Sequence, residues 1–551
     1  MNGAQWFVKT LKNCGVGYVF TLCGNGLDPF LKACKEFNIK VIDTRNEQSA
    51  AYMADAWGRI TKKLEVVAVS SGPGHTNALT GLANAYWDGG PMMLVSGCSS
   101  QETRGLDNFQ EIDQVGMASP VCKYANMVRQ ISHLPHEVNK AISLAVTGRP
   151  GAVHLTIPAD VFNAKLDDSK LRQTLPPSKV EYHCPGDPDL IKDAVKMLSS
   201  AKKPFIVVGS GVFYADAWNE LSEFAKLTDI PIVSHIWDRC CIEKVIPQYM
   251  GVTNAELNYA MQKFSEADTI LMMSARVDYR VSCGLPPGFP KDAKVIRVDI
   301  EPSEITRALI PDIGIVGNPK SVLAGMVEEA KSLKWDNTNW LSDVQKTRDS
   351  LIRKWDNLCH EDVCPVPSLR IIREIKKSLD RDVTFLLDGG NIGRWAHMIL
   401  FDRHPSHWFT CGASGVVGWG LPGAVAIKLA KPDKPLLLLS GDGAAGFTVS
   451  EIETALRFGT PYVAVIAHDS AWGIVADGQG DECHVASELG EIRFDRVAQA
   501  LGAEGIFIDD PRQLRPSIDW ALSSDKVVII HVPTQLAGIS FWEERFGACK
   551  K

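Results

Sequence analysis

At 551 residues, the chain is long for one hydrophobic core, and its length predicts about three domains. The hydrophobic fraction of 45%, the charged fraction of 22% and the net charge of -7 are typical of globular proteins, and the lack of long basic runs argues against a nucleic-acid partner. No apolar stretch reaches membrane-spanning length, and residues 1–12 lack the apolar core of a signal peptide. The 14 cysteines show no repeated Cys-x-x-Cys spacing, so we expect buried thiols in a reducing cytoplasm.

Apolar strands and helices alternate along the chain at the spacing of α/β proteins, which predicts parallel sheets covered by helices on both faces. Two polar stretches, at about 165–189 and 335–367, interrupt this alternation. We therefore expect an α/β protein with three doubly wound parallel-sheet domains, at residues 1–165, 186–335 and 366–551.

The first segment with a chemical signal begins at Val41 and ends at Arg59. An apolar strand is predicted before Arg45, and an alanine-rich helix is predicted to start near Glu47. The helix dipole alone favours a glutamate in the first helical turn. Glu47 by itself therefore does not indicate a catalytic role.

Polar groups on neighbouring predicted loops add to this signal. Gln110 belongs to the segment Phe109–Val115, and Asn25 lies in a Cys-Gly-Asn-Gly sequence. Both side chains are polar enough to meet the oxygens of a substrate. Glycine-flanked asparagines are most often turn residues, so Gln110 is the stronger prediction of the two.

The middle block contains a strand, Pro204–Val208, that runs into a Gly-x-Gly turn. It lacks a third glycine at the dinucleotide spacing, so it indicates a nucleotide only weakly. The segment Ser274–Arg280 follows another predicted strand. Its two arginines fit either a bound nucleotide or a solvated loop.

The third block carries the strongest pattern, a strand, a glycine-rich turn, a helix and a second strand, predicted at Leu436–Leu439, Ser440–Gly446, Thr448–Arg457 and Tyr462–Ala467. Gly441-Asp442-Gly443 opens the turn, and His468-Asp469 follows the second strand. A glycine turn that leads into a helix places free N–H groups and the helix dipole near a phosphate. Carboxylates at the ends of neighbouring parallel strands converge, and such a pair beside a phosphate favours a hard cation such as Mg²⁺.

This pattern resembles the thiamine-diphosphate (ThDP) motif, which begins Gly-Asp-Gly and usually ends in two asparagines. The chain has His468-Asp469 at that end, and an aspartate still ligates Mg²⁺ through oxygen. Together with the segments around Glu47 and Gln110, Ser70–Asn77 and Gly415–Pro422 also match. The chain thus resembles the ThDP-dependent decarboxylase and carboligase family, the acetolactate synthase-like group, from about residue 5 to about residue 540.

The resemblance implies a pyrimidine-binding first domain, a central domain and a diphosphate-binding third domain, with the two outer domains sharing one fold. It implies that Glu47 activates the cofactor, with Gln110 and Asn25 beside the substrate, and that Val417 supports the bent cofactor. The metal ligands implied are Asp442, Asp469 and the carbonyl of Ala471. The cofactor-binding residues implied are Gly390, Asn391, Ile392, Gly415, Val417, Gly441, Asp442, Gly443, Ala444, Asp469, Ala471, Trp472 and Gly473.

In this family the cofactor spans two subunits, so the separation of Glu47 from the metal motif implies a homodimer or homotetramer with its active site at the subunit interface. The expected partner is a small-molecule substrate, without nucleic acid or membrane. Thiamine diphosphate and Mg²⁺ are the expected cofactors. FAD, which some relatives hold in the central domain, is not favoured because only weak glycine and arginine signals support it.

The expected activity is that of a carboligase, a transferase of acetaldehyde-type units or a carbon–carbon lyase acting on 2-oxo acids or 2-hydroxy ketones. The chain contains no His-His pair, which simple decarboxylases of the family use to release an aldehyde, so ligation is favoured. Two alternatives stay open. Gly284–Pro290 and Val298–Ile300 resemble 2-hydroxyacyl-CoA lyases and oxalyl-CoA decarboxylases, and the altered Asn-Asn motif permits a catalytically silent homologue that serves as a binding subunit.

Overall fold

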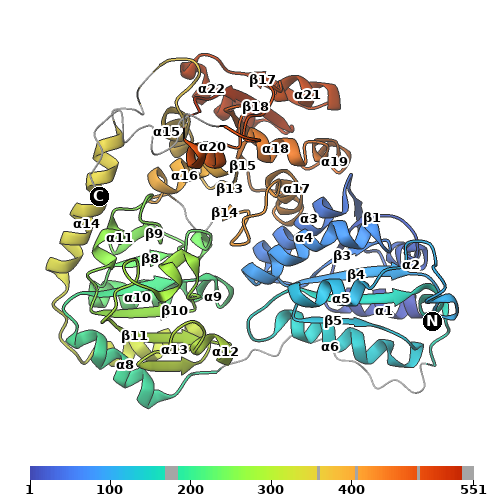
Figure 1. Ribbon diagram of the computed structural model, residues 1–551, viewed down its shortest axis with the longest axis horizontal. Helices are drawn as coiled ribbons and strands as arrows, with labels where there is room; N and C mark the ends of the chain where they lie inside the picture. The colour runs from blue at the N-terminus through green and yellow to red at the C-terminus, as the bar shows by residue number, and fades with distance from the viewer. Residues whose placement is uncertain (168–183, 357–359, 361, 404–407, 481–483, 537–551) are drawn as a thin grey trace.

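The computed structural model describes residues 1–167, 184–356, 360, 362–403, 408–480 and 484–536. Within them the chain forms three lobes, each built around one six-stranded sheet (Figure 1). Every ladder between neighbouring strands of these sheets is parallel. The prediction of three α/β domains with parallel sheets is confirmed, whereas the domain boundaries stay a prediction.

The first sheet has the order β2-β1-β3-β4-β6-β5. Its strands are β1 (Tyr18–Leu22), β2 (Lys40–Asp43), β3 (Glu65–Val69), β4 (Met92–Cys98), β5 (Tyr124–Met127) and β6 (Val153–Pro158). β3 is buried along its whole length, as expected of an inner parallel strand covered on both faces. One face packs on α1 (Gly3–Asn13), α2 (Asp28–Glu36), α6 (Leu134–Val146) and α7 (Ala159–Asn163), and the other on α3 (Glu47–Thr61) and α4 (Pro73–Asp88); α5 (Gln114–Ala118) follows β4.

The third sheet repeats this topology. Its order is β14-β13-β15-β16-β18-β17, which becomes 2-1-3-4-6-5 when the strands are counted from β13, the same as in the first sheet. The shared fold implied for the outer domains is therefore present. The strands are β13 (Thr384–Asp388), β14 (Trp408–Thr410), β15 (Leu436–Gly441), β16 (Val463–His468), β17 (Glu504–Phe507) and β18 (Val528–Pro533), and the helices are α15 (Ser368–Ser378), α16 (Gly390–Ile399), α17 (Gly420–Ala430), α18 (Asp442–Phe447), α19 (Glu451–Arg457), α20 (Gly473–Gln479), α21 (Phe494–Leu501) and α22 (Pro511–Ser523).

The central sheet has a different order, β12-β11-β10-β7-β8-β9, which is the strand order of dinucleotide-binding folds. Its strands are β7 (Pro204–Val208), β8 (Ile232–Ser234), β9 (Tyr249–Val252), β10 (Thr269–Met273), β11 (Lys294–Asp299) and β12 (Ile313–Val316). The helices are α8 (Pro188–Ser200), α9 (Ser210–Tyr214), α10 (Trp218–Thr228), α11 (Ala260–Phe264), α12 (Pro302–Ile305) and α13 (Pro319–Ala330). Short 3-10 turns occur at Gln101–Thr103, Ser119–Val121, Ile131–His133, Arg239–Cys241 and Tyr279–Gly284.

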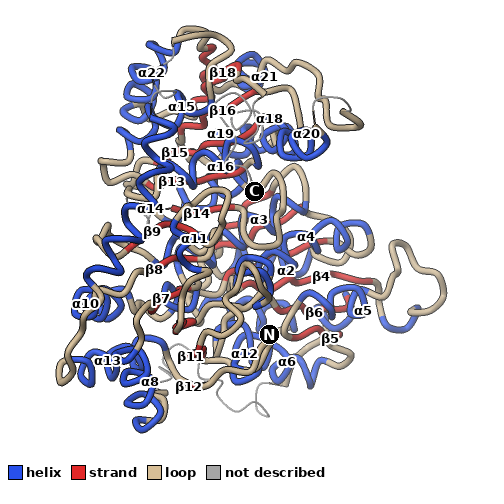
Figure 2. The backbone as a smooth tube through the Cα atoms, turned by 60° about the vertical axis from the view of Figure 1, so that its left-hand side comes forward, coloured by secondary structure: helices blue, strands red, loops and turns tan. Residues whose placement is uncertain are grey.

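The two polar stretches between the predicted domains differ. Residues 168–183 of the first stretch lie outside the described residues. The second stretch contains a long helix, α14 (Thr338–Asp356), which runs along the outer side of the molecule from the central to the third domain (Figure 1, Figure 2). Among the described residues, no helix is long and apolar enough to cross a membrane.

The secondary structure of the ThDP-like motif differs in detail from the prediction. The predicted turn Ser440–Gly446 is mostly a short helix, α18, and the helix predicted from Thr448 begins at Glu451. Thr448 separates the two helices because its side chain donates to the carbonyl of Gly418 (2.8 Å). Gly390, Asn391 and Ile392, which the resemblance implies as cofactor-binding residues, form the first turn of helix α16.

The first and third domains share one hydrophobic core. Tyr52 of α3 and Val425 of α17 belong to the same cluster of buried apolar side chains, together with Trp419. Ion pairs at the rim of this contact join Arg45 to Glu453 (2.8 Å) and Arg457 to Asp43 (2.5 Å). The shared core therefore fixes how the two outer domains sit against each other, with α17 between them (Figure 1).

Candidate active site

A cavity of about 290 Å³ lies at the carboxyl edge of the third sheet. This is the edge at which doubly wound sheets bind ligands. All the residues implied to bind the cofactor line it, from Gly390 in α16 to Gly473 in α20. Their location agrees with the expected site, and their individual roles stay a prediction.

Three helix N-termini meet at this cavity. The first residues of α16, α18 and α20, namely Gly390, Asp442 and Gly473, all line it. The first N–H groups of a helix have no partner within the helix, and its dipole favours negative charge at this end. The cavity is therefore built to receive an anion such as a diphosphate.

Glycines allow the backbone to close around the cavity. A Cβ atom on Gly389, which has φ of +129°, would lie 2.5 Å from the backbone nitrogen of Gly441. A Cβ atom on Gly473 would lie 2.8 Å from Oδ2 of Asp469. These contacts are shorter than side chains tolerate, so the close approach of strand ends and helix starts depends on glycine.

Two carboxylates line the cavity directly after the neighbouring strands β15 and β16: Asp442, which is buried, and Asp469, which is half-buried. Oδ1 of Asp442 accepts the N–H of Gly443 (2.9 Å), and Oδ2 of Asp469 accepts the side-chain amide of Asn391 (3.2 Å). Burial raises the pKa of Asp442; burial, reinforced by the negative charge of Asp442, raises the pKa of Asp469 to about 7. A divalent cation between two such carboxylates would offset their mutual repulsion.

His468 lies beside this pair, with its Nε2 3.7 Å from Oδ2 of Asp442, but its hydrogen bond goes to another segment. Its Nε2 accepts the N–H of Ile492 (3.3 Å), and its ring centroid lies 4.8 Å from that of His531. Burial lowers the pKa of His468, so the neutral imidazole ties the strand end to the segment before α21. The described residues contain no group of three His, Cys, Asp or Glu side chains arranged for a metal, so further ligands would come from the backbone or the cofactor.

Glu47 occupies the first position of α3 in the first domain and is only 8% exposed. Its Oε2 accepts the side-chain amide of Asn77 (2.9 Å). The Cα of Gly74, in the first turn of α4, is also close, since a Cβ atom there would lie 3.1 Å from Oε1 of Glu47. The carboxylate is thus held by the segment that follows β3.

Asn25 and Gln110 meet through a third residue. The amide of Asn25 donates to the hydroxyl of Ser71 (3.3 Å), and this hydroxyl donates to Oε1 of Gln110 (3.3 Å). Gln110 has φ of +61°, a strained conformation for a residue other than glycine. The loop is anchored by Gln114, whose side chain accepts from the N–H of Gly72 (3.3 Å) and donates to the hydroxyl of Thr156 (3.0 Å).

The structure does not bring the two groups of predicted residues together within one chain. Among the described residues, neither Glu47 nor Gln110 nor Asn25 lines the cavity of the third domain. One link between the two domains lies five residues after Glu47, where the Tyr52 hydroxyl donates to the carbonyl of Val417 (3.2 Å).

The cavity is also lined by residues that the sequence does not predict. These are Trp237, Ser368, Asp388, Cys411 and Thr534. Asp388 is a carboxylate at the end of a strand, which is a usable signal, but its Oδ2 accepts the N–H of Gly420 (2.6 Å). Burial raises the pKa of Asp388 to about 7. Asp388 therefore anchors α17 in addition to lining the cavity.

A second cavity, of about 240 Å³, lies at the edge of the central domain and is lined by Lys62, Arg149, Arg276, Arg280 and Asp299 among others. The solvated-loop interpretation of Ser274–Arg280 is wrong for Arg280, which is buried and paired with Asp278 (2.9 Å). Arg276 pairs with Glu304 (3.2 Å). A nucleotide at this cavity stays a prediction.

Comparison with known proteins places these features in one family. Models of the thiamine pyrophosphate (ThDP) enzymes match three segments: the N-terminal TPP binding domain at residues 1–117, the central domain at 191–326 and the C-terminal TPP binding domain at 388–532. The chain is 31% identical to acetolactate synthase isozyme 3 large subunit of Escherichia coli (strain K12), over 97% of the chain and 94% of that relative. It is 30% identical to a probable acetolactate synthase large subunit of Methanococcus aeolicus, over 96% and 91%, and 29% identical to glyoxylate carboligase of Escherichia coli O157:H7, over 95% and 90%. The chain therefore belongs to the thiamine pyrophosphate enzyme family.

Proposed function

We propose that the protein is a Mg²⁺- and ThDP-dependent carboligase that joins or cleaves carbon–carbon bonds in 2-oxo acids and 2-hydroxy ketones. The observation that carries this proposal is the cavity at which three helix N-termini and two carboxylates meet. The names of the relatives, acetolactate synthase and glyoxylate carboligase, support the direction of the reaction.

The residues at this cavity fit a magnesium diphosphate. The N–H groups at the starts of α16, α18 and α20 would hold the diphosphate, and the carboxylates of Asp442 and Asp469 with the carbonyl of Ala471 would hold Mg²⁺ through oxygen. When bound, ThDP supplies an electron sink for the carbon–carbon bond that forms or breaks. The apolar side chain of Val417 would support the cofactor from below.

Glu47 would supply the proton chemistry. Asn77 occupies Oε2 of Glu47, which leaves Oε1 to hold a proton against a ring nitrogen of the cofactor. Gln110 and Asn25, linked through Ser71, would orient the oxygens of the substrate by hydrogen bonds. These three residues give the first domain a role distinct from that of the third.

We further propose that a second copy of the chain completes the active site. Glu47 does not line the cavity of its own chain, and the loop that carries Gln110 exposes Leu106 and Phe109, which are 72% and 73% exposed. On the third domain, Phe447 and Val475 are also exposed, next to the cavity-lining segments. Exposed apolar groups at these two places suit an interface between two copies.

Mixing two inactive variants tests this arrangement. In the Glu47→Gln and Asp442→Ala variants, a dimer of one type has no intact site, whereas a mixed dimer has one. If subunits assort at random, co-expression should restore roughly a quarter of the wild-type activity. No recovery in isolated mixed dimers would contradict the shared site.

Product analysis tests the reaction itself. Pyruvate with Mg²⁺ and ThDP should give acetolactate, and a panel of 2-oxo acids, 2-hydroxy ketones and acyl-CoA thioesters identifies the preferred substrates. Free aldehyde alone, even at high acceptor concentration, would contradict the carboligase. Turnover of only the thioesters would favour the lyase alternative, and no turnover with ThDP bound would favour the silent homologue.

We propose that the central cavity does not hold a stoichiometric flavin, because the strand β7 is followed by a Gly-x-Gly sequence without the third glycine. The absorbance spectrum of the freshly purified protein tests this proposal. A flavin band at one equivalent per chain would overturn it.

A further inference from the structure

The cofactor cavity has one wall from another domain. Trp237, which follows strand β8 of the central domain, lines the cavity beside Cys411 and Val416. Among the described lining residues, the others belong to the predicted third domain. The central domain, which the sequence suggested only as a nucleotide carrier, thus contributes a large aromatic surface to the site.

The indole ring of Trp237 is held from two sides. Its Nε1 donates to the hydroxyl of Tyr279 (2.8 Å), and its ring meets His397 of α16 edge to face, with centroids 5.7 Å apart. The Tyr279 hydroxyl in turn donates to the carbonyl of Ala413 in the third domain (2.9 Å). Ala413 is four residues before Val417. These hydrogen bonds therefore join Trp237 and Tyr279 to the segment that lines the cavity at Val417.

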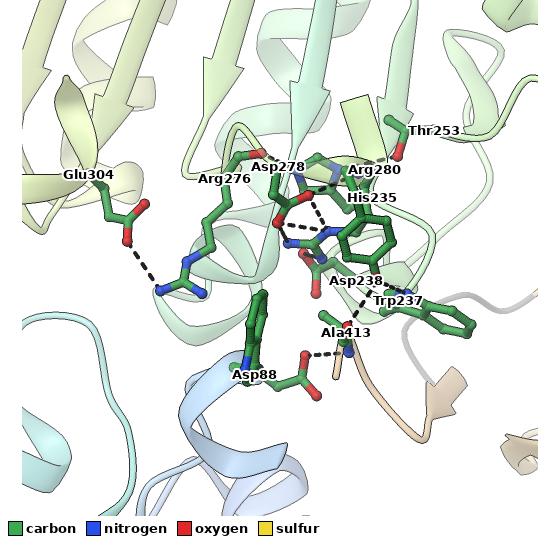
Figure 3. A network of polar contacts seen from close by, with 12 residues as sticks. Asp88, His235, Trp237, Asp238, Thr253, Arg276, Asp278, Arg280, Glu304 and Ala413 are labelled. Carbon is green, nitrogen blue, oxygen red and sulfur yellow. Dashed lines mark hydrogen bonds and ion pairs between the residues drawn. The ribbon is translucent and has the colours of Figure 1, made fainter. Parts of the chain in front are cut away.

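Buried charges fix the two aromatic residues from behind. Asp238, next to Trp237, pairs with Arg280, next to Tyr279, at 3.2 Å, and Arg280 also pairs with Asp278 at 2.9 Å. Figure 3 shows Asp238, Asp278 and Arg280 together, with Trp237 and Ala413 at the border between the domains. A buried charge that loses its partner is costly, so this ion-pair group resists rearrangement. Hydrogen bonds and ion pairs thus link five residues into one group: Trp237, Asp238, Asp278, Tyr279 and Arg280.

We propose that Trp237 limits the size of the substrate chain that the cofactor cavity accepts, and that Tyr279 positions it. This inference rests on the proposed carboligase function. A rigid indole with both its ring and its N–H held in place excludes volume that a mobile side chain would yield. The cavity is also lined by the apolar side chains of Val416, Val417 and Ile474, so an alkyl group that entered the freed space would contact apolar surface.

The test is a series of 2-oxo acids of increasing length, from pyruvate to 2-oxobutanoate and 2-oxopentanoate. With wild-type holoenzyme, KM should rise with each added methylene. In Trp237→Ala the preference should flatten, so that KM for 2-oxopentanoate relative to pyruvate falls at least tenfold, because a hydrophobic pocket discriminates about tenfold or more per methylene. Tyr279→Phe, which keeps the ring but loses the hydroxyl, should shift the same ratio in the same direction by a smaller factor.

A binding measurement separates this inference from the proposed function. Acylphosphonates are analogues of 2-oxo acids that cannot decarboxylate, and calorimetry gives their affinities for the holoenzyme without turnover. Trp237→Ala should raise the affinity for the longest acylphosphonate, relative to the affinity for the shortest, by a similar factor of at least ten. Absence of a ligation product would contradict the carboligase, but the acylphosphonate series would still report on the size limit.

Matched controls exclude general effects of losing an aromatic group. Trp520→Ala removes an exposed indole on α22, and Tyr124→Phe removes a hydroxyl that bonds Glu137 in the first domain. Both should leave the length preference unchanged. If Trp237→Ala changes KM and acylphosphonate affinity equally for all chain lengths, the inference is overturned. Should that variant fail to fold, an unchanged length preference in Tyr279→Phe and Trp237→Phe overturns it instead.

Discussion

The first and third domains have the same strand order but carry opposite kinds of chemistry at the same edge of the sheet. In the third domain, helix N-termini and two carboxylates line the cavity proposed for a diphosphate and a cation. In the first domain, Glu47, Gln110 and Asn25 are held by neutral partners, Asn77 and Ser71. The topology thus determines where a site forms, whereas the few residues after each strand determine what the site does.

The largest expected effect comes from a substitution in the first domain, at Glu47. Glu47→Gln should lower turnover by about a thousandfold or more, because an amide cannot hold or release the proton that a carboxyl group moves. ThDP affinity should stay within about threefold, since the third domain would hold the diphosphate and the cation. Steady-state kinetics and calorimetry of ThDP binding measure the two quantities.

The matched control is Glu36→Gln, an exposed glutamate on α2 that accepts a hydrogen bond from Gln5. It should change neither turnover nor affinity. A Glu47→Gln variant that retains near-normal hydrogen–deuterium exchange at C2 of ThDP would show that Glu47 does not activate the cofactor.

A substitution in the third domain should instead lower the affinity for ThDP. Asp442→Ala removes one of the two carboxylates proposed for Mg²⁺, and ThDP affinity should fall by about a hundredfold because the diphosphate then lacks its bridging cation. Calorimetry at fixed Mg²⁺ measures this loss, with the exposed Asp433→Ala as control. Undiminished ThDP binding after removal of all divalent metal, in wild type, would refute the proposed metal site.

The sequence predicts the cavity of the third domain better than it predicts how the first and third domains combine into one active site. Strand ends, glycines and Asp442 are local features, and local patterns are what a sequence reveals directly. The sequence predicts a turn over Ser440–Gly446, where α18 forms, because glycine-rich segments seldom continue as helix. Trp237 could not be found, because it reaches the cavity through packing between domains that no local pattern encodes.

The acidic pair also predicts a pH dependence that an Asp–Asn pair would lack. Because the pKa of Asp469 is about 7, the apo protein holds a proton on this carboxyl group below pH 7. Mg²⁺ needs the ionised carboxylate. Mg²⁺–ThDP affinity should therefore fall as pH drops below 7, by roughly 20- to 30-fold between pH 7.5 and 5.5, and level off above pH 7.5. Calorimetry across this range, with proton release measured in two buffers, checks the sign and size. A flat profile would mean that Asp469 is ionised before the cation binds.

The smallest effect is expected from Asp469→Asn, which replaces the unusual pair by the common Asp plus Asn. The amide oxygen still ligates a cation, so Mg²⁺–ThDP affinity at pH 7.5 should stay within about threefold. The apo protein should become more stable at pH 7.5 but not at pH 4, because a carboxyl whose pKa is raised on folding lowers the stability of the protein as pH rises from its unfolded pKa, about 3.9, to about 7. Thermal unfolding at both pH values tests this difference, and the pH profile of binding should flatten. Equal stabilisation at both pH values would mean that packing, and not the charge of Asp469, causes the difference in stability. The acidic pair would then not explain a pH dependence of stability in this chain.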